Sequence, residues 1–416
     1  MTTQSHAQTL RVQGRYLLTP CGDTVVLRGV NKMNVYDAND FGIGTFAEIA
    51  KTGANCVRIV WRSDIPGADA AAMERVIAAC LKEKMIPMLE LHDATCNWSK
   101  LGIVQDFWQR ADVMQVLRKY QTRMLLNIAN EAGSYDDMVS DDEYRTRYGA
   151  IISMFRINGF NAPLVIDATN CGQDIERIFR TFRALTIGDP KGNLMFSLHA
   201  YWDPKYVANP LPVMVEKLAE SVRLNVPLIV GEFTGIYLSD LTTDDPMYRV
   251  LLDECARHSI GLLAWEWGPG NGDFSVSPPK LYPKMDMTSN GTFTGIKDGW
   301  SKEFLLTHRH SVKNSSVISD YMRLGGCVTT VEGASDNETS LRILPNPVAQ
   351  HCTLRGTKTG DGYTMYDELG NQAGCGVADG ESVHIDCSQL NAGAYTIRLL
   401  RTGVAAPLVA RFVVTR

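Results

Sequence analysis

Two glutamates follow apolar runs that are typical of buried strands. Glu131 ends the stretch "LLNIANE", and Glu232 lies in "LIVGEF". A single glutamate at a strand end is usually solvated or ion-paired, because an unpaired buried carboxylate is costly. Two carboxylates can divide the work of catalysis, since one protonates a leaving group while the other attacks carbon or activates water. Glu131 and Glu232 are therefore candidate catalytic residues.

Polar and aromatic side chains occupy the ends of the other apolar runs. They are Asn31, Arg58, His92, Asp93, Asn130, His199, Tyr201, Trp265 and Trp267. Each alone has a structural interpretation: a satisfied core histidine, a barrel-lining arginine in an ion pair, or a tryptophan that only packs. With two carboxylates they favour glycoside hydrolysis, in which tryptophan faces stack on sugar rings while asparagine and histidine donate to hydroxyls.

Eight short apolar runs alternate with amphipathic helical stretches up to residue 325. The runs are 25–31, 56–61, 85–93, 123–131, 163–169, 194–202, 227–233 and 261–268, and helical patterns cover 69–84, 141–159, 211–225 and 244–259. Continuous apolar runs are expected when helices cover the outer faces of a parallel sheet. The repeats predict an α/β fold, a (β/α)8 TIM barrel, with its active site at the carboxyl ends of the strands. An open doubly wound sheet would need a glycine-rich phosphate loop, and "LRGVNKMN" is not one.

The pattern changes near residue 326. Residues 326–340 are small and polar and are typical of a linker. Residues 341–416 contain short segments separated by glycine and aspartate, among them "YTMYDELGN" and "AGAYTIRLL". We therefore expect a barrel over 1–325 and a small antiparallel, sandwich-like β domain over 341–416.

Composition excludes several classes of protein. The net charge is −5 with no run of lysine and arginine, which gives no footprint for nucleic acid or anionic membranes. No apolar run reaches 18 residues, so we expect no membrane span. The adjacent His92 and Asp93 lack a third ligand at suitable spacing, and we expect neither a metal nor a cofactor.

Ten cysteines are present, none in a C-x-x-C pair. Those in the first 260 residues are widely spaced, and Cys56 and Cys80 lie in apolar runs, so buried small hydrophobes are expected rather than a disulfide framework. Cys352, Cys375 and Cys387 could include one disulfide. The start of the chain has no apolar h-region, so it is not an intact signal peptide, although "SHAQ" would suit a trimmed one.

Seven segments resemble family 5 glycoside hydrolases in order and spacing. They are "LRGVN", "ANCVRIVW", "MLELHDAT", "LLNIANE", "FSLHAY", "LIVGEF" and "LLAWEWG", within residues 20–325. The resemblance implies a retaining double displacement on β-linked polysaccharide, with Glu131 as general acid/base and Glu232 as nucleophile. It further implies binding roles. Arg58 and Tyr201 would hold the nucleophile, Asn130 the 2-hydroxyl, His92 and His199 would line the site, and Trp265 would stack under the sugar, with Trp267 beside it or only packing.

The polysaccharide is less clearly indicated. Several motifs look closest to bacterial β-mannanases, but the loop "NKMNVYD" lacks the tryptophan that those enzymes carry there. That departure favours an endo-β-1,4-glucanase, with an endo-β-1,4-mannanase as the alternative. A transglycosylase uses the same residues, and a non-catalytic polysaccharide-binding barrel would usually have lost one glutamate.

The tail resembles the C-terminal sorting domain of Bacteroidetes type IX secretion. The resemblance rests on "ILPNPV" (343–348), "YDELGN" (366–371) and "IDCSQLNAGAYTIRL" (385–399). It implies export through the outer-membrane secretion machinery and a secreted or cell-surface location. A carbohydrate-binding module is less favoured, because all seven tryptophans lie before residue 301.

Overall fold

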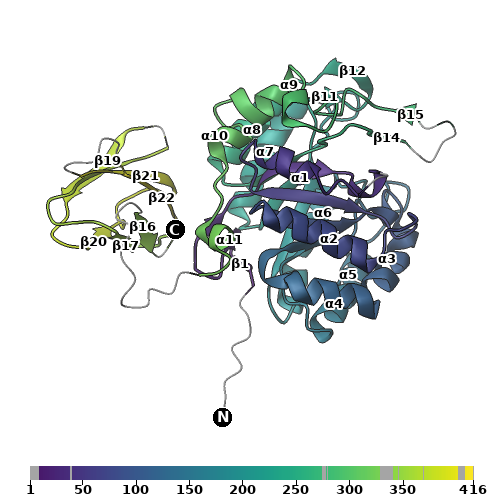
Figure 1. The fold of residues 1–416 in the computed structure, drawn as a ribbon, viewed down its shortest axis with the longest axis horizontal. Helices are drawn as coiled ribbons and strands as arrows, with labels where there is room; N and C mark the ends of the chain where they lie inside the picture. The colour runs from purple at the N-terminus through teal and green to yellow at the C-terminus, as the bar shows by residue number, and fades with distance from the viewer. Residues whose placement is uncertain are drawn as a thin grey trace, which may run out of the picture. The chain divides into compact units, whose positions relative to one another are not determined.

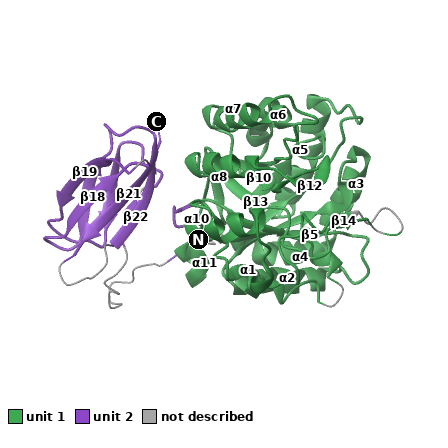
Figure 2. Cartoon of the chain, turned by 90° about the horizontal axis from the view of Figure 1, so that it is seen from above, with its two compact units in different colours: residues 1–20, 25–326 green, residues 21–24, 327–416 purple. Residues whose placement is uncertain are grey.

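The structure is a computed structural model that describes residues 9–37, 40–273, 278, 280–327, 341–344, 346–368, 370–401 and 408–415. The chain forms two compact units, one of residues 1–20 and 25–326 and the other of residues 21–24 and 327–416 (Figure 2). Most of the predicted linker, from residue 328 to 340, lies outside the described residues. Among the residues that are described, no helix is both long and apolar enough to span a membrane.

The first unit is a closed parallel barrel, as the sequence predicts (Figure 1). Its neighbouring strands run in the order β10-β13-β4-β5-β6-β7-β8-β9. Each strand therefore pairs with the next barrel strand along the chain, and the last of them, β13, pairs with the first, β4, to close the barrel. All eight predicted runs supply a strand. The strands are β4 Arg28–Lys32, β5 Cys56–Trp61, β6 Ile86–Leu91, β7 Leu125–Asn127, β8 Leu164–Asp167, β9 Leu194–His199, β10 Leu228–Glu232 and β13 Gly261–Ala264.

Helices between these strands begin where short polar side chains can cap them. Asp69 accepts from the backbone N–H of Ala72, and Ser140 does the same for Glu143, which satisfies first-turn donors. All four predicted helices form, although the last begins at Met247 rather than 244. The helices are α1 Thr45–Ala50, α2 Ala70–Lys82, α3 Leu101–Trp108, α4 Ala111–Tyr120, α5 Asp141–Ile157, α6 Ile175–Gly188, α7 Pro210–Arg223, α8 Met247–Arg257, α9 Trp300–Lys302, α10 Val312–Ser315 and α11 Asp320–Leu324.

Short strands outside the barrel decorate the first unit. Residues at the predicted start of the last helix belong instead to a hairpin after β10, and a second hairpin follows β13. The additional strands are β1 Arg11–Gln13, β2 Tyr16–Leu18, β3 Thr24–Val25, β11 Ile236–Tyr237, β12 Asp240–Asp244, β14 Gly272–Asp273 and β15 Lys280–Leu281.

The second unit consists of two antiparallel sheets, as expected for the tail. One has the order β16-β17-β20 and the other β19-β18-β21-β22. Buried side chains from both sheets, including Leu354, Ile397 and Phe412, form one apolar core. The strands are β16 Arg342–Leu344, β17 His351–Arg355, β18 Gly362–Tyr366, β19 Gln372–Val377, β20 Ser382–Asp386, β21 Gly393–Leu400 and β22 Leu408–Val414.

The cysteines differ from the expectation. Cys21 is bonded to Cys327, and Cys96 to Cys171, whereas Cys352, Cys375 and Cys387 are all free. The prediction of a disulfide within the tail trio was therefore wrong. Cys56 and Cys80 are buried free thiols, as predicted. The pairings could not be found by spacing, because 306 and 75 residues separate the bonded partners.

Candidate active site

Arg58 is the centre of a buried polar network inside the barrel. It lies in the middle of β5 with no exposed surface. Its guanidinium donates to Glu232 Oε1 at 2.7 Å, to Asn130 Oδ1 at 2.7 Å and to three further oxygens, on Asn31, Asn127 and Asp167. Burial alone lowers the pKa of Arg58, but the carboxylates around it, Glu90 first among them, raise it overall. Arg58 therefore stays charged and ties five strands or strand ends together.

Glu232 is the last residue of β10 and is 3% exposed. One carboxylate oxygen accepts from Arg58 and the other accepts from the Tyr201 hydroxyl at 2.8 Å. Burial raises the pKa of Glu232, while the neighbouring cations His199 and Arg58 oppose that rise. Both oxygens are thus fixed in place, as a nucleophile requires.

Glu131 lies in a loop, four residues beyond the end of β7. The sequence analysis placed it at the end of the strand, in the predicted run of 123–131. Its backbone has a φ of +48°, a left-handed conformation that is unusual outside glycine. The Glu131 N–H donates to Asp167 Oδ2 at 3.1 Å, and its side chain contacts His199 Nδ1 at 2.7 Å. This turn aims the Glu131 carboxylate back over the barrel mouth.

His199 ends β9 and lies between the two glutamates. Its Nδ1 is 2.7 Å from Glu131 Oε1 and 3.3 Å from Glu232 Oε2, and its Nε2 is 3.3 Å from Asp167 Oδ2. Burial alone would lower the pKa of His199, but the carboxylates, Glu232 and Asp167 first, raise it to about 10. The opposite holds for Asp167: burial raises its pKa, yet His199 and Arg58 bring it down to about 2.

The spacing of the two candidate catalytic carboxylates bears on the chemistry. Oxygens of Glu131 and Glu232 lie within 4.8 Å of each other. Retaining glycosidases hold their carboxyl groups about 5–5.5 Å apart, whereas inverting enzymes need roughly 6.5–9.5 Å to admit a water. The short separation fits direct attack by Glu232 on a sugar bound between the two side chains.

A second group of side chains forms the wall beside the glutamates. The His92 ring stacks on Trp265 with centroids 5.7 Å apart, and His92 Nε2 lies 3.4 Å from Asn130 Nδ2. Although burial alone lowers it, the pKa of His92 is raised, because Glu90 lies 2.8 Å from Nδ1. This wall presents an imidazole edge and an amide to a ligand.

Two other residues from the sequence analysis lie away from the carboxylates. Trp267 is fully buried, and its indole N–H donates to the Gly291 carbonyl, so its ring has no face free for a sugar. Asp93 accepts from the backbone N–H of Ser63 and so holds a neighbouring loop.

A cavity of about 610 Å³ opens beside the ends of β4 and β13, lined by Tyr36 and Asn290 among others, and offers room for more of a long substrate.

Three network residues were missed by the sequence analysis. Glu90, Asn127 and Asp167 are fully buried and surround Arg58. Each is a lone polar residue within an otherwise apolar strand, and such a residue is seldom buried unless it is paired. That exception to the apolar pattern was the available signal.

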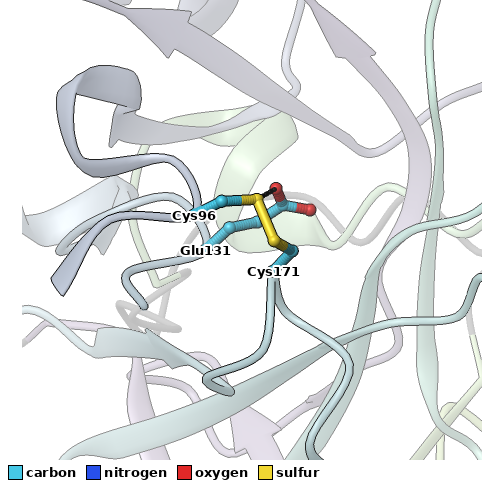
Figure 3. A group of neighbouring side chains, drawn as sticks. All are labelled: Cys96, Glu131 and Cys171. Carbon is cyan, nitrogen blue, oxygen red and sulfur yellow. Dashed lines mark hydrogen bonds between the residues drawn. A yellow bond between two sulfur atoms is a disulfide. The ribbon is translucent and has the colours of Figure 1, made fainter. Parts of the chain in front are cut away.

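Among the residues that the structure describes, two groups of side chains have the donor types and spacing of a metal site. In the first, Cys96 and Cys171 flank Glu131, but their sulfurs are joined as a disulfide and offer no thiolate (Figure 3). In the second, Glu131, His199 and Glu232 lie together, but Arg58 and the protonated His199 already supply positive charge there. Hydrogen bonds within the chain thus account for these carboxylates.

A TIM barrel with paired glutamates at the carboxyl ends of β7 and β10, joined by arginine, histidine and tyrosine, defines a glycoside hydrolase. Sequence comparison agrees with this class. The profile described as "Cellulase (glycosyl hydrolase family 5)" matches residues 22–271. The chain belongs to glycosyl hydrolase family 5 and is an endo-glycanase of that family.

Individual relatives narrow the comparison. The chain is 25% identical to a mannan endo-1,4-beta-mannosidase of Cellvibrio japonicus, over 85% of this chain and 76% of the relative. It is 28% identical to an enzyme of the same name from Salipaludibacillus agaradhaerens, over 62% and 80% of the two chains. A beta-mannanase structure from Streptomyces thermolilacinus superposes with a TM-score of 0.64 at 26% identity, covering 76% of this chain and all of the other.

Proposed function

We propose that this protein is an endo-β-1,4-mannanase that acts by retaining double displacement. The separation of less than 4.8 Å between oxygens of Glu131 and Glu232 carries the proposal of retention. The choice of mannan rests on the relatives, which are named as mannanases and include a mannohexaose complex from Thermomonospora fusca. It replaces the glucan that the first loop favoured in the sequence.

The mechanism follows from the contacts of each glutamate. Glu232 attacks the anomeric carbon as the glycosidic C–O bond breaks, and Glu131 gives its proton to the departing oxygen. Arg58 and Tyr201 hold the attacking oxygens by hydrogen bonds of 2.7 and 2.8 Å. Having given up its proton in the first step, Glu131 is a carboxylate that takes a proton from the water as that water displaces the sugar from Glu232, which restores both groups.

The wall of His92 and Asn130 is the proposed reader of the 2-hydroxyl, the group that differs between mannan and glucan. Asn130 is held by Arg58 on its oxygen and donates to Thr95 Oγ1 at 3.0 Å, so its orientation is fixed. Glu90 anchors His92 Nδ1, and His92 Nε2 lies 3.4 Å from Asn130 Nδ2, so the ring and the amide are held together as one surface. Trp265, stacked behind that ring and 7% exposed, supports the wall.

The test of substrate is reducing-end release from galactomannan, glucomannan and carboxymethylcellulose in parallel, with Glu232→Ala as the blank. A mannanase hydrolyses both mannans and leaves carboxymethylcellulose intact. Hydrolysis of carboxymethylcellulose without galactomannan would restore the glucanase. Proton NMR of the first product distinguishes β from α anomer and tests retention independently.

The roles of the glutamates are tested by leaving groups. Glu232→Ala abolishes turnover while the fold stays cooperative. Glu131→Gln keeps most of its kcat/KM on a dinitrophenyl glycoside, which leaves without a proton, and loses about 10²–10⁴-fold on polysaccharide. Near-normal polysaccharide turnover by either variant contradicts its assigned role.

We propose further that residues 341–416 are a type IX sorting domain, joined through the segment 326–340, and that the protein acts outside the cell. Asn346 of the "PNP" motif bonds the last strand through both amide atoms, to Arg411 and Val413, so the motif secures the chain terminus. Two disulfides suit an oxidising compartment. Deletion of the tail in a host with that pathway should leave the enzyme in the periplasm; unchanged export refutes the proposal.

A further inference from the structure

The disulfide Cys96–Cys171 lies directly against the Glu131 carboxylate (Figure 3). It joins the loop that follows β6 to the loop that follows β8, and the Glu131 loop runs between them. The Cys96 sulfur is 3.6 Å from Glu131 Oε2. A disulfide sulfur carries no proton to donate, so this contact is one of packing: the bond forms a wall that limits where the carboxylate can go.

Both cysteines also hold the backbone of the Glu131 loop. The Cys96 N–H donates to the Glu131 carbonyl at 3.0 Å, and the Cys171 N–H donates to the Gly133 carbonyl at 2.9 Å. Thr95 and Ala132 form an isolated β-bridge between the loop that follows β6 and the Glu131 loop. Residues 131–133 are therefore hydrogen-bonded on one side by Cys96 and on the other by Cys171, and the disulfide fixes the distance between these two cysteines.

These contacts hold three residues in a left-handed backbone conformation that they would not otherwise prefer. Glu131, Cys96 and Cys171 have φ values of +48°, +49° and +49°. A left-handed backbone is unfavourable for any residue other than glycine, and such residues persist only where the surroundings determine them. With three of them in mutual contact, release of one loop lets all three relax toward negative φ.

The loop that follows β8 also contacts His199. The His199 N–H donates to the Gly172 carbonyl at 2.8 Å, and a Cβ on Gly172 would come within 2.5 Å of the His199 ring. Since His199 Nδ1 contacts Glu131 Oε1, the same disulfide restrains the Glu131 carboxylate through two routes, one direct and one through this ring.

We propose that Cys96 and Cys171 are positioning residues for the general acid/base Glu131, and that their bond holds this carboxylate in line with the departing oxygen. The inference rests on the proposed function, since it takes Glu131 as the acid. A misplacement near 1 Å costs about 10²-fold in rate, so opening the bond should cost about 10–100-fold wherever the acid is needed.

The experiment compares Cys96→Ser/Cys171→Ser with the matched control Cys21→Ser/Cys327→Ser, which removes the other disulfide. Serine keeps a Cβ and similar size, so only the bond is lost. The measurement is kcat/KM on aryl β-glycosides of the preferred disaccharide, from dinitrophenyl to poor leaving groups, together with circular dichroism melting. Glu131→Gln is run beside them as the reference for a lost acid.

Positioning predicts a steeper dependence on leaving group. The Cys96→Ser/Cys171→Ser enzyme should lose about 10–100-fold on poor leaving groups and less than about threefold on the dinitrophenyl glycoside. The control should match the parent on all substrates. An equal loss on every substrate means a merely structural role and overturns the inference, as does no loss at all.

Two results separate this inference from the proposed function. If Glu131→Gln itself shows no dependence on leaving group, the acid assignment fails. If Glu131→Gln shows a dependence on leaving group but Cys96→Ser/Cys171→Ser does not, only the positioning inference fails. Should the serine pair not fold, a water-soluble phosphine applied to the folded Cys21→Ser/Cys327→Ser enzyme opens the remaining bond, giving two thiols and the phosphine oxide, and the same substrates are measured before and after.

Discussion

Asp167→Asn is the substitution that most directly probes the buried charge network. The Asp167 carboxylate accepts from the Glu131 N–H at 3.1 Å and from Asn127 Nδ2 at 2.9 Å, and lies 3.3 Å from both Arg58 and His199. Asparagine keeps the shape but removes the charge and puts an amide donor among donors. The two cations then lose a partner that they cannot replace from water.

The expected magnitude follows from those contacts. Removing one partner of a fully buried ion pair costs about 3–5 kcal/mol. For a unit of this size that corresponds to a fall in Tm of roughly 5–7 °C. Because Asp167 is one of the carboxylates that raise the pKa of His199 to about 10, that pKa should fall in the variant.

The assays are calorimetry for the free energy of unfolding and NMR titration of the His199 ring, assigned with a His199→Gln variant. The matched control is Asp189→Asn. Asp189 is 4% exposed and pairs with Arg156 through two contacts of 2.9 Å, at the end of α6. The control should lose comparable stability with His199 unmoved. If Asp167→Asn left the pKa of His199 near 10, the electrostatic reasoning would be wrong.

Three further predictions address the same site. Gly172→Ala, whose Cβ would meet the His199 ring at 2.5 Å, should lower kcat/KM by about tenfold, while Gly188→Ala on α6, which meets nothing, should not. Stability, followed by calorimetry against pH, should decline on both sides of a plateau from about pH 4 to 6.5. Asp167, with its pKa lowered from 3.8 to about 2, stabilises the fold above 3.8 and loses that effect as pH falls through 2. His199, with its pKa raised from 6.5 to about 10, stabilises the fold below pH 6.5 and loses that effect as pH rises through 10. His199→Gln should remove the alkaline decline, whereas Asp167→Asn should remove the acid decline and move the alkaline one to lower pH. Arg58→Lys should abolish most activity, because one ammonium cannot reach five oxygens, and reduced binding without loss of kcat would contradict this.

The sequence was sufficient for the barrel because its strands are local features. Continuous apolar runs and polar helix starts at Asp69 and Ser140 mark elements within a few residues, and the barrel then brings the strand ends to one mouth. That reasoning reached Arg58 and both glutamates. It stopped short at Asp167, which ends an apolar run and was taken as part of the strand rather than as a residue facing Arg58.

Features that depend on distant loops could not be predicted. The left-handed turn at Glu131 is held by two hydrogen bonds: the Cys96 N–H donates to the Glu131 carbonyl, and the Glu131 N–H donates to the Asp167 carboxylate. These partners are 35 and 36 residues away in the chain. The burial of Trp267 depends on the Gly291 carbonyl, and no periodicity in the sequence connects them. The relatives favour mannan over the glucan that the sequence favoured for a similar reason, because the absence of a tryptophan from one loop says little about which residues at the other strand ends approach the 2-hydroxyl.

The answer to why a carboxylate is buried at the end of β10 lies in what surrounds it. Glu232 loses hydration, which raises its pKa, but it gains Arg58, Tyr201 and His199 within 3.3 Å. Arg58 and His199 in turn keep their charges because carboxylates surround them: Glu90 is the main one for Arg58, Glu232 the main one for His199, and Asp167 lies 3.3 Å from each. Since Arg58 bonds residues of β4, β7, β8 and β10, the group that holds the proposed nucleophile also ties these strands to β5, and we expect stability and reactivity to change together at this position.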